Sequence, residues 1–295
     1  MDDARDLLAT RLGARPLHRV AGGGYTLMEH WLVELPDGGR GFAKLAVDEP
    51  SAEFLRAEHR VYSQLDAPFA PDLLGWEDDG QRPVLVLEDL SEGHWPPPWR
   101  EGDVDAVLQA LEELHDTSPP EGLPQLTGDD VSGWPEVEAD PQPFLALGLC
   151  SGEWLEQALP ELVAAAERCP VAGDSFLHLD VRSDNVCLRE GRALLVDWNW
   201  AHLGNPSVDV AFWLPSLFTE GGPAPTELMP DAGELTAVVS GFFAPRAGLP
   251  PPAGAPTVRP LQLAQLKVAL PWAVEVLGLP PLDAQSAAAG RSAPT

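Results

Sequence analysis

Three polar residues in the middle of the chain have the types and the spacing that phosphoryl transfer needs. Asp180 follows His178 in the run His-Leu-Asp, Asn185 comes five residues after Asp180, and Asp197 comes twelve residues after Asn185. One carboxylate can orient an attacking hydroxyl and accept its proton, while an amide and a second carboxylate can hold Mg²⁺ against the phosphates of a nucleotide. Apolar runs flank these positions, as expected for a loop followed by a strand that ends in the second aspartate. The spacing therefore indicates the active site of a kinase.

A structural interpretation of the same residues stays open at this stage. Asp184 and Asn185 are good turn formers, so the segment could be a polar turn between two core strands, with Asp197 ending the second strand. Each short motif is common by chance, and their joint spacing is what favours the chemical interpretation.

With its neighbours, this segment resembles the catalytic region of the aminoglycoside phosphotransferase and choline-kinase-like family. His178-Leu-Asp180 with Asn185 matches the catalytic loop, and Val196-Asp197-Trp198 matches the metal-binding motif. Gly204-Asn205-Pro206 and then Asp209-Val-Ala211 are similar to the stretch that follows. The resemblance is dense over residues 176–213, thinner back to residue 20 and weak beyond residue 220. It implies a two-lobed protein-kinase-like fold of the α+β class, with a small β-rich N-lobe and a larger, mainly helical C-lobe.

The resemblance also implies roles and cofactors. Asp180 would be the catalytic residue, Asn185 and Asp197 would be the metal ligands, and the cofactors would be ATP (or GTP) and Mg²⁺. The loop departs from the family at Asp184, because it carries Val-Arg-Ser-Asp where many members have a His or Leu, a Pro and a Gly. Asp184 would contact the acceptor or the metal, or form the turn before Asn185, and we favour the turn.

A lysine and a glutamate upstream fit the nucleotide site of the same fold. Lys44 is one of two lysines among 18 basic residues and lies in an apolar run that predicts a short buried strand. A compact ammonium suits contacts with phosphates, whereas a lysine reaching out from an edge strand to solvent is the alternative. Residues 51–65 have helical periodicity with Ser51 as N-cap, and by resemblance Glu58 pairs with Lys44. Glu53 is the competitor, but in the first turn it suits the helix dipole better.

Two further segments would complete the nucleotide site. Gly22, Gly23 and Gly24 separate two strand-like runs, and such a turn lets backbone N–H groups approach phosphates, although three glycines suit an ordinary hairpin equally well. An apolar strand over 83–87 runs into Glu88 and Leu90. The resemblance implies that the backbone groups of these two residues meet the edge of the adenine.

The chain is strongly acidic, and the excess is concentrated in one region. It has 46 acidic and 18 basic residues, a formal charge of −28, and sixteen acids without any lysine or arginine lie between Glu101 and Glu167. Such a field excludes nucleic acid as a partner and disfavours an anionic membrane, while it attracts cations. A small cationic acceptor is therefore expected. Solubility, or adaptation to a salty cytoplasm, is the alternative explanation of the charge.

The segment after the metal motif limits the size of the acceptor. Only eleven residues separate Asp197 from Asp209, which leaves no room for the peptide-docking segment of a protein kinase. By resemblance, the acidic region inserts beside the catalytic loop and should flank the acceptor. Glu153 and Glu156, one helical turn apart, and Glu275 on a C-terminal helix are the carboxylates expected to bind it.

Composition sets consistent limits. At 295 residues the chain is long enough for two lobes. No run approaches 18 apolar residues and the acidic N-terminus lacks the features of a signal peptide, so no membrane partner and a cytoplasmic location are expected. Cys150, Cys169 and Cys187 show no metal-like spacing and are expected to be reduced core thiols. A monomer or a homodimer is expected.

The organisation should follow the lobes. The N-lobe is expected over residues 1–87, a linker over 88–100, the C-lobe over 101–283 and a disordered tail over 284–295. Loops are expected at 117–143 and 244–260. Helices in the C-lobe are expected at 104–115, 144–149, 154–168, 226–243 and 261–277, the last broken or kinked at Pro271.

Three functions remain open. The leading hypothesis is a kinase of a cationic amino-sugar or aminoglycoside, which includes antibiotics. The second keeps the fold but has a neutral sugar, a macrolide or an amino-alcohol as acceptor. The third is a non-catalytic, nucleotide-binding pseudokinase. It is weakened because the lysine, the glutamate, the catalytic aspartate, the asparagine and the metal-binding aspartate are all present. The sequence does not identify the acceptor.

Overall fold

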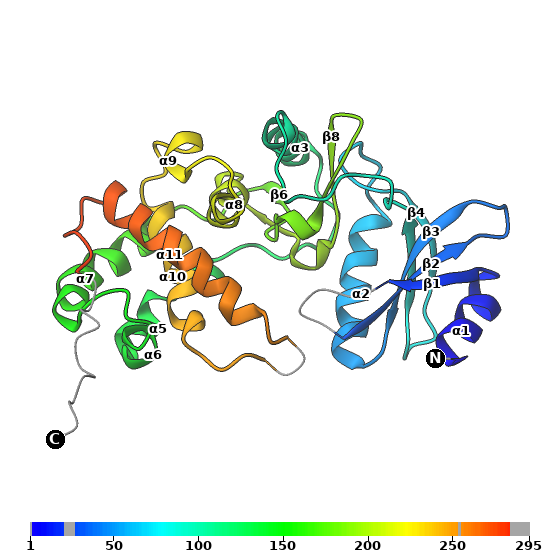
Figure 1. The fold of residues 1–295 in the computed structure, drawn as a ribbon, viewed down its shortest axis with the longest axis horizontal. Coiled ribbons are helices and arrows are strands. Elements are labelled where there is room, and N and C mark those ends of the chain that lie inside the picture. Colours follow the sequence, from blue (N-terminus) through cyan, green and yellow to red (C-terminus); the bar gives the residue numbers. More distant parts are fainter. Residues whose placement is uncertain (1, 21–26, 253–254, 284–295) are drawn as a thin grey trace, which may run out of the picture.

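The computed structural model describes residues 2–20, 27–252 and 255–283. Figure 1 shows two parts along the long axis, a sheet with two helices and a larger, mainly helical part. The predicted α+β class is therefore confirmed. Within these ranges, no helix combines the length and the apolar character needed to cross a bilayer.

The N-terminal part is a five-stranded antiparallel sheet between two helices, with strand order β1-β2-β3-β5-β4 (Figure 1). Its elements are α1 (Asp2–Leu12), β1 (Arg15–Val20), β2 (Met28–Glu34), β3 (Arg40–Ala46), α2 (Glu49–Tyr62), β4 (Leu73–Glu77) and β5 (Val84–Glu88). Successive side chains of a strand face opposite sides. Accordingly, Val86 packs in one cluster with Leu8 of α1, and Leu87 packs in another with Leu55 of α2. Helix α1 has no counterpart among the predicted elements.

Helix α2 begins earlier than predicted. Asp48 is its N-cap, because its carboxylate accepts the N–H of Ser51 at 2.9 Å and the Ser51 hydroxyl oxygen accepts the N–H of Asp48 at 3.0 Å. Ser51, predicted to be the cap, is instead the third helical residue and completes a capping box. The helix ends at Tyr62 and buries Glu58 on its inner face.

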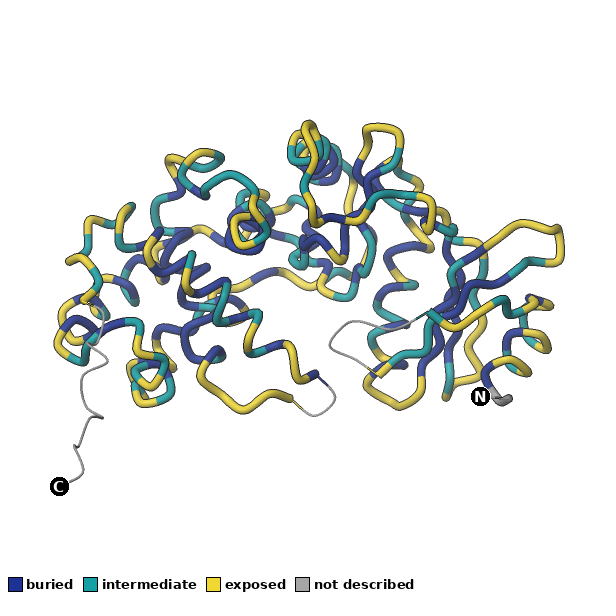
Figure 2. The backbone as a smooth tube through the Cα atoms, viewed as in Figure 1, coloured by how far each residue is buried: buried dark blue, intermediate teal, exposed yellow. Residues whose placement is uncertain are grey.

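The C-terminal part surrounds two short strand pairs with helices. β6 pairs with β9 and β7 pairs with β8, both antiparallel. Buried residues, dark blue in Figure 2, follow the strand pairs and the central helices α8 and α10. The elements are α3 (Asp103–Asp116), α4 (Gly128–Val131), α5 (Trp134–Ala139), α6 (Gln142–Leu145), α7 (Gly152–Arg168), β6 (Ser175–Leu177), η1 (Ser183–Asn185), β7 (Val186–Arg189), β8 (Arg192–Leu195), η2 (Trp198–Trp200), β9 (His202–Gly204), α8 (Ser207–Thr219), α9 (Pro225–Leu228), α10 (Leu235–Ala247) and α11 (Val258–Val276).

The stretch 117–143, predicted to be a loop, contains α4, α5 and the start of α6. Trp134 is fully buried, and its indole N–H donates to the carbonyl of Ala237 on α10 at 2.8 Å. Its ring meets Phe144 edge-on, with centroids 5.6 Å apart. Such short helices are stable only through tertiary packing, so a few large buried side chains replace the periodicity that sequence reasoning looks for.

Two predicted helices are shorter or divided. The helix expected at 144–149 ends at Leu145, and Gly148, at φ 69°, turns the chain towards α7. The helix expected at 226–243 is replaced by α9 and α10. Gly233, at φ 52°, lies in the turn between them.

The last two helices extend into the segment that was predicted to be a loop. Because α10 runs to its end at Ala247 and α11 begins at Val258, the loop expected at 244–260 is shorter. Helix α11 continues past Pro271 as one element. The tail 284–295, expected to be disordered, lies outside the described residues.

Candidate active site

The side chain of Lys44 joins the two parts of the molecule. It projects from β3, and its Nζ donates to both carboxylate oxygens of Glu58 at 2.7 and 2.9 Å and to Oδ1 of Asp197 at 3.1 Å. Glu58 is fully buried, whereas Glu53, the competing glutamate, is exposed. Burial alone would lower the pKa of Lys44, but the charges of Asp197 and Glu58 outweigh it and raise the pKa. The ammonium therefore stays charged.

Asp197 stands between β8 and η2 in the left-handed backbone region, at φ 72° and ψ 62°. A residue with a Cβ adopts such a conformation at a cost of about 1–3 kcal/mol, so its contacts must hold it there. Oδ1 accepts from Lys44 and, at 2.8 Å, from Nδ2 of Asn199. Burial favours a raised pKa of Asp197, but the charge of Lys44 and its hydrogen bond lower the pKa below its usual value. Asp197 is therefore an ionised carboxylate.

The loop that carries Asp180 is held by a buried aspartate of α8. Oδ2 of Asp209 accepts the N–H of His178 at 2.9 Å, and Oδ1 accepts the N–H of Leu179 at 2.6 Å. Leu179 also has a left-handed backbone, at φ 60°, which these bonds stabilise. On the far side, Oδ2 of Asp209 is bonded to Nε2 of His115 at 3.0 Å. Asp209 thus fixes the backbone immediately before Asp180.

The carboxylate of Asp180 lies between an amide and a guanidinium. Oδ2 accepts from Nδ2 of Asn185 at 3.0 Å, and Nε of Arg182 is 3.7 Å from Oδ1. Burial raises the pKa of Asp180, and the charge of Arg182 opposes the shift. Solvent still reaches 19% of the side chain. A carboxylate with a raised pKa that a substrate can reach has the properties of a general base.

Asp184 binds Arg182. Its carboxylate oxygens accept from Nε and Nη2 of Arg182 at 3.0 and 2.8 Å, and it lies in the 3₁₀ turn η1 immediately before Asn185. Its side chain is 59% exposed, whereas that of Arg182 is 9% exposed. The carboxylate therefore holds the guanidinium beside Asp180.

Asn185 and Asp197 present oxygen atoms suited to magnesium. Nδ2 of Asn185 donates to the backbone carbonyl and to the carboxylate of Asp180, which leaves Oδ1 as the acceptor end of the amide. Mg²⁺ prefers oxygen ligands, and one or two carboxylates usually hold it together with phosphates and water. No group of three or more His, Cys, Asp or Glu side chains in the described ranges is placed to hold a metal. Such a sparse donor set fits a metal that arrives with a nucleotide.

The segment after β5 runs beside β7, the strand that follows Asn185, because His94 and Leu188 form a β-bridge. The side chain of Glu88 pairs with Arg189 at 2.6 Å, which favours its backbone as the part that would contact a nucleobase. The carbonyl of Leu90 accepts the N–H of Gly93 at 3.0 Å, so Leu90 would meet a nucleobase through its own N–H. Gly22, Gly23 and Gly24, predicted to approach the phosphates, lie outside the described residues.

Cys187 lies directly beneath this segment. A Cβ built on Gly93 would stand 2.1 Å from Sγ of Cys187. The cysteine is fully buried in a small cluster with Leu90 and Leu194, and burial raises its pKa to about 11. The thiol is therefore a packing element under the linker.

Comparison with known proteins decides the family. The model of the phosphotransferase enzyme family matches residues 21–242, which is most of the chain. The chain belongs to this family. It is therefore an enzyme of small-molecule phosphoryl transfer, for which ATP and Mg²⁺ are the family's usual donor and metal.

Three solved structures share the fold of this phosphotransferase at low sequence identity. A choline/ethanolamine kinase family protein from Mesorhizobium loti has a TM-score of 0.57 and 15% identity, over 91% of this chain and 93% of that one. A putative fructosamine-3-kinase from Thermobifida fusca has 0.53 and 18%, over 92% and 99%. A macrolide 2′-phosphotransferase from Brachybacterium faecium has 0.53 and 16%, over 94% and 91%. These matches show the protein-kinase-like fold, and none of the curated proteins matches the chain in sequence.

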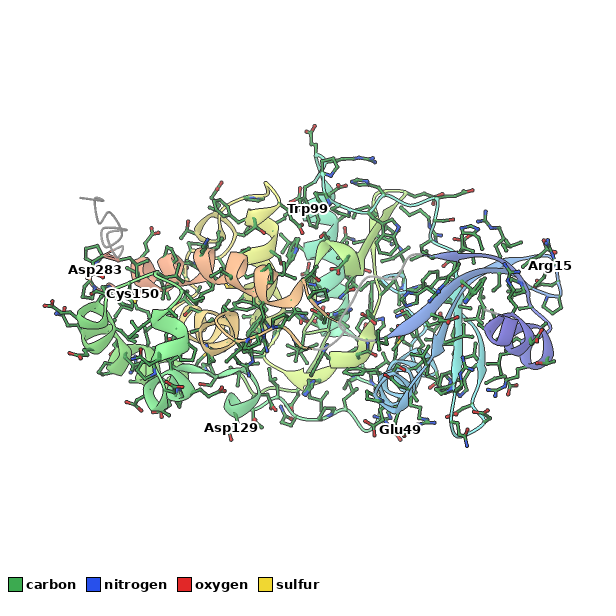
Figure 3. All side chains as sticks on the ribbon, turned by 60° about the horizontal axis from the view of Figure 1, so that its bottom comes forward. Arg15, Glu49, Trp99, Asp129, Cys150 and Asp283 are labelled. Carbon is green, nitrogen blue, oxygen red and sulfur yellow. The ribbon has the colours of Figure 1, made fainter. Side chains whose placement is uncertain are left out.

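The three glutamates expected to bind the acceptor do not lie beside Asp180. Glu153 and Glu156 are exposed near the start of α7. Figure 1 shows α7 at the end of the phosphotransferase opposite the sheet, and Cys150, just before α7, lies at that end in Figure 3. Glu275 is exposed at the C-terminal end of α11, which points the same way (Figure 1). The structure therefore does not bring them into the active site.

Sequence reasoning assigned no role to three residues that organise the site of this phosphotransferase. Asp209 was noted only as part of a motif, although its fixed distance from Asp197 was a usable signal. Arg182 stands two residues from both Asp180 and Asp184, and this alternation of charge was a weaker signal. Asn199 had no signal beyond its place two residues after Asp197.

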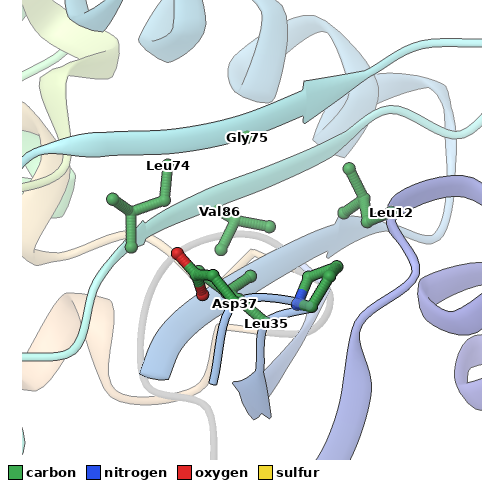
Figure 4. Close-up of a pocket in the computed structure, with 7 residues that line it drawn as sticks. Leu12, Leu35, Asp37, Leu74, Gly75 and Val86 are labelled. Atoms are coloured by element: carbon green, nitrogen blue, oxygen red, sulfur yellow. The ribbon is translucent and has the colours of Figure 1, made fainter. Parts of the chain in front are cut away.

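A pocket of about 250 Å³ lies elsewhere, on the outer side of the sheet (Figure 4). It is lined by residues of α1, β4, β5 and the turn after β2, among them Leu12, Asp37 and Val86. Val86 faces α1, whereas Lys44 faces α2. The pocket therefore opens on the side of the sheet away from the active site.

Proposed function

We propose that this phosphotransferase transfers the γ-phosphate of ATP to a hydroxyl of a small, cationic molecule such as an aminoglycoside or an amino-sugar. The observation that carries the proposal is the contact of Lys44 with Glu58 on one side and with Asp197 on the other. It joins the N-terminal sheet to the loop region that holds Asp180 and Asn185, where a nucleotide and an acceptor would meet.

Each residue then has one task. Lys44 binds the α- and β-phosphates, with Glu58 holding its ammonium in place. Asn185 and Asp197 hold Mg²⁺, which when bound neutralises charge on the phosphates and orients the transferred group. Asp180 orients the acceptor hydroxyl and takes up its proton, consistent with a raised pKa and partial exposure.

The base and phosphates of ATP would use backbone groups of the N-terminal part. The carbonyl of Glu88 and the N–H of Leu90 would pair with the edge of the adenine, and Gly22, Gly23 and Gly24 would cover the phosphates. We also propose that the enzyme works in the cytoplasm, where ATP and Mg²⁺ are available.

The cationic character of the acceptor rests on charge. The formal charge of −28 and the sixteen acids between Glu101 and Glu167 create a field that attracts cations. Glu153, Glu156 and Glu275 lie away from Asp180, so we propose that they act through this field and not through contact with the acceptor. A neutral sugar, a macrolide or an amino-alcohol as acceptor is the alternative.

The experiment that tests the proposal is coupled ATP turnover against a panel of acceptors. The panel contains aminoglycosides, peptide antibiotics, amino-sugars, amino-alcohols, macrolides and neutral sugars, each with wild type and with Asp180→Asn. Turnover with cationic acceptors that disappears in the variant supports the proposal. A preference for a neutral acceptor would contradict the cationic acceptor class and support the alternative. Binding of nucleotide without turnover of any acceptor would indicate a pseudokinase.

A further inference from the structure

Asn199 is bonded to the carboxylate that is assigned to the metal. It lies in η2, and its Nδ2 donates to Oδ1 of Asp197 at 2.8 Å. Nζ of Lys44 donates to the same oxygen at 3.1 Å. Because both donors lie on Oδ1, the other oxygen of Asp197 is the one available to a metal ion.

The opposite end of the Asn199 amide is buried and unpaired. Within the described ranges, Oδ1 of Asn199 has no hydrogen-bond partner, although solvent does not reach it. Four other buried side-chain atoms share this property: Tyr62 Oη and the indole nitrogens of Trp198, Trp213 and Trp272. Indole nitrogens only donate and a phenol can do both, so Asn199 contributes the sole obligate acceptor among them.

The orientation of this amide is fixed by its neighbour. If the amide were turned over, its oxygen would face Oδ1 of Asp197, and two acceptors would repel each other at hydrogen-bond distance. The NH₂ group must therefore face Asp197, and the oxygen must stay on the other branch. A buried acceptor without a partner is costly to leave unpaired, so such an atom calls for a water or an ion.

We propose that Oδ1 of Asn199 accepts a hydrogen bond from a water molecule of the Mg²⁺ that Asn185 and Asp197 hold with the nucleotide. This inference rests on the proposed function. Mg²⁺ loses its water reluctantly and usually keeps several water ligands in a nucleotide site. Residues that bond such ligands orient them and tune the affinity of the metal. Asn199 is thus a positioning residue, with one end of its amide on Asp197 and the other on the hydrated ion.

The test uses the full-length protein, Mn²⁺ as a paramagnetic substitute for Mg²⁺, and a non-hydrolysable ATP analogue. Free Mn²⁺ is titrated by electron paramagnetic resonance with and without the analogue. Asn199→Ala should weaken Mn²⁺ binding to the protein–analogue complex about 10–100-fold, the range typical for loss of an outer-shell partner. Binding of the analogue without metal should change little. Asn199→Ser is the second variant if the alanine variant does not fold.

Asn205→Ala is the matched control. Asn205 lies in the same segment, but both ends of its amide are paired, with the carbonyl of Pro170 at 2.7 Å and the N–H of Ser207 at 3.0 Å. Its loss should lower the melting temperature of the ligand-free protein and leave Mn²⁺ affinity unchanged. Asn199→Ala should lower Mn²⁺ affinity in addition to any loss of melting temperature, because the bond from its Nδ2 to Asp197 also stabilises the ligand-free protein.

The outcomes separate this inference from the proposed function. If wild type and Asp197→Ala bind Mn²⁺ equally with the analogue present, the metal site itself is wrong, and both proposals fail. If Asp197→Ala loses Mn²⁺ and Asn199→Ala keeps it, only the role of Asn199 is overturned. Normal Mn²⁺ affinity together with a raised KM for a cationic acceptor would assign Oδ1 to the acceptor instead.

Discussion

At the scale of single residues, the imidazole of His178 sets the geometry of the catalytic loop. Its Nδ1 accepts the N–H of Asp180 at 3.2 Å, and its Nε2 is bonded to the carbonyl of Val196 at 2.9 Å. A carbonyl can only accept, so Nε2 carries the proton and Nδ1 is free of it. The ring is fully buried, and burial lowers the pKa of His178. The neutral ring thus connects the loop of Asp180 to the strand that leads to Asp197.

This geometry predicts a loss of stability in acid. Unfolded histidine titrates near ~6.5, and the pKa of His178 in the folded protein is lower. The contribution of the neutral ring is therefore present above pH ~6.5 and is lost as the pH falls towards the folded value, because the unfolded state binds the proton first. The free energy of unfolding in urea should fall more steeply from pH 7.5 to 5 in wild type than in His178→Gln.

Other groups titrate in the same range, so the difference between the two curves is the quantity to compare. His18→Gln is the control, since His18 is exposed on β1. It should keep the slope of wild type. Parallel curves for wild type and His178→Gln would show that the buried ring does not contribute to the pH dependence of the free energy of unfolding.

The carboxylate of Asp180 gives the kinetic prediction at this scale. Asp180→Asn removes the proton acceptor but keeps the shape of the side chain, so turnover should fall by about 10²–10⁴, the usual worth of general-base positioning. The Kd for ATP, measured by calorimetry, should change little. Turnover within a few-fold of wild type would mean that Asp180 does not act as the base.

At the scale of elements, α2 matters because it brings Glu58 to Lys44. Glu58→Gln should weaken Mg·ATP binding and lower the free energy of unfolding by about 1–3 kcal/mol, since a buried ammonium loses one of two carboxylate partners. Both effects are measurable by calorimetry and by urea unfolding. Glu53→Gln, exposed on the same helix, is the matched control and should change neither. Equal effects of the two substitutions would contradict the claim that Glu58 holds the ammonium of Lys44.

The elements also show what the sequence could predict. Strands with apolar runs, such as β5, and amphipathic helices, such as α3 and α7, appear close to their expected ranges because their own periodicity encodes them. The helices in 117–143 were missed because Trp134 and Phe144 stabilise them through distant partners. Single turns such as Gly148 and Gly233 then decided where the neighbouring helices end.

The candidate site divides in the same way. Lys44, Glu58, Asp180, Asn185 and Asp197 come together as spacing and resemblance indicated, because a loop and two strand ends carry most of them. Contacts that depend on which way a side chain turns were beyond the sequence. The contact of Asp184 with Arg182 is one example. The position of α7, which keeps Glu153 away from Asp180, depends on how the helices pack and was also beyond the sequence.

At the scale of the whole molecule, the charge of −28 makes acceptor binding sensitive to salt. Attraction through solvent is screened over roughly 8–10 Å near physiological ionic strength. The KM for the best cationic acceptor should therefore rise between low and high salt, with a smaller change in kcat. Neutralising Glu153 and Glu156 together should reproduce only part of this rise, since both lie away from Asp180. A KM indifferent to salt would leave the acidity as a matter of solubility.

Because Cys187 lies beneath Gly93, the rate at which its thiol is modified should report how often the linker over residues 88–100 opens. While the chain lies across Sγ, and while burial keeps the thiol protonated, no accessible thiolate is present to attack a thiol reagent. Modification requires a local opening of the linker, so the modification rate depends on how often this opening occurs. A nucleotide that binds at Leu90, as proposed above, should slow this modification. Cys150 is buried and lies at the far end of the molecule (Figure 3), so its modification rate should not change with the nucleotide and provides an internal reference.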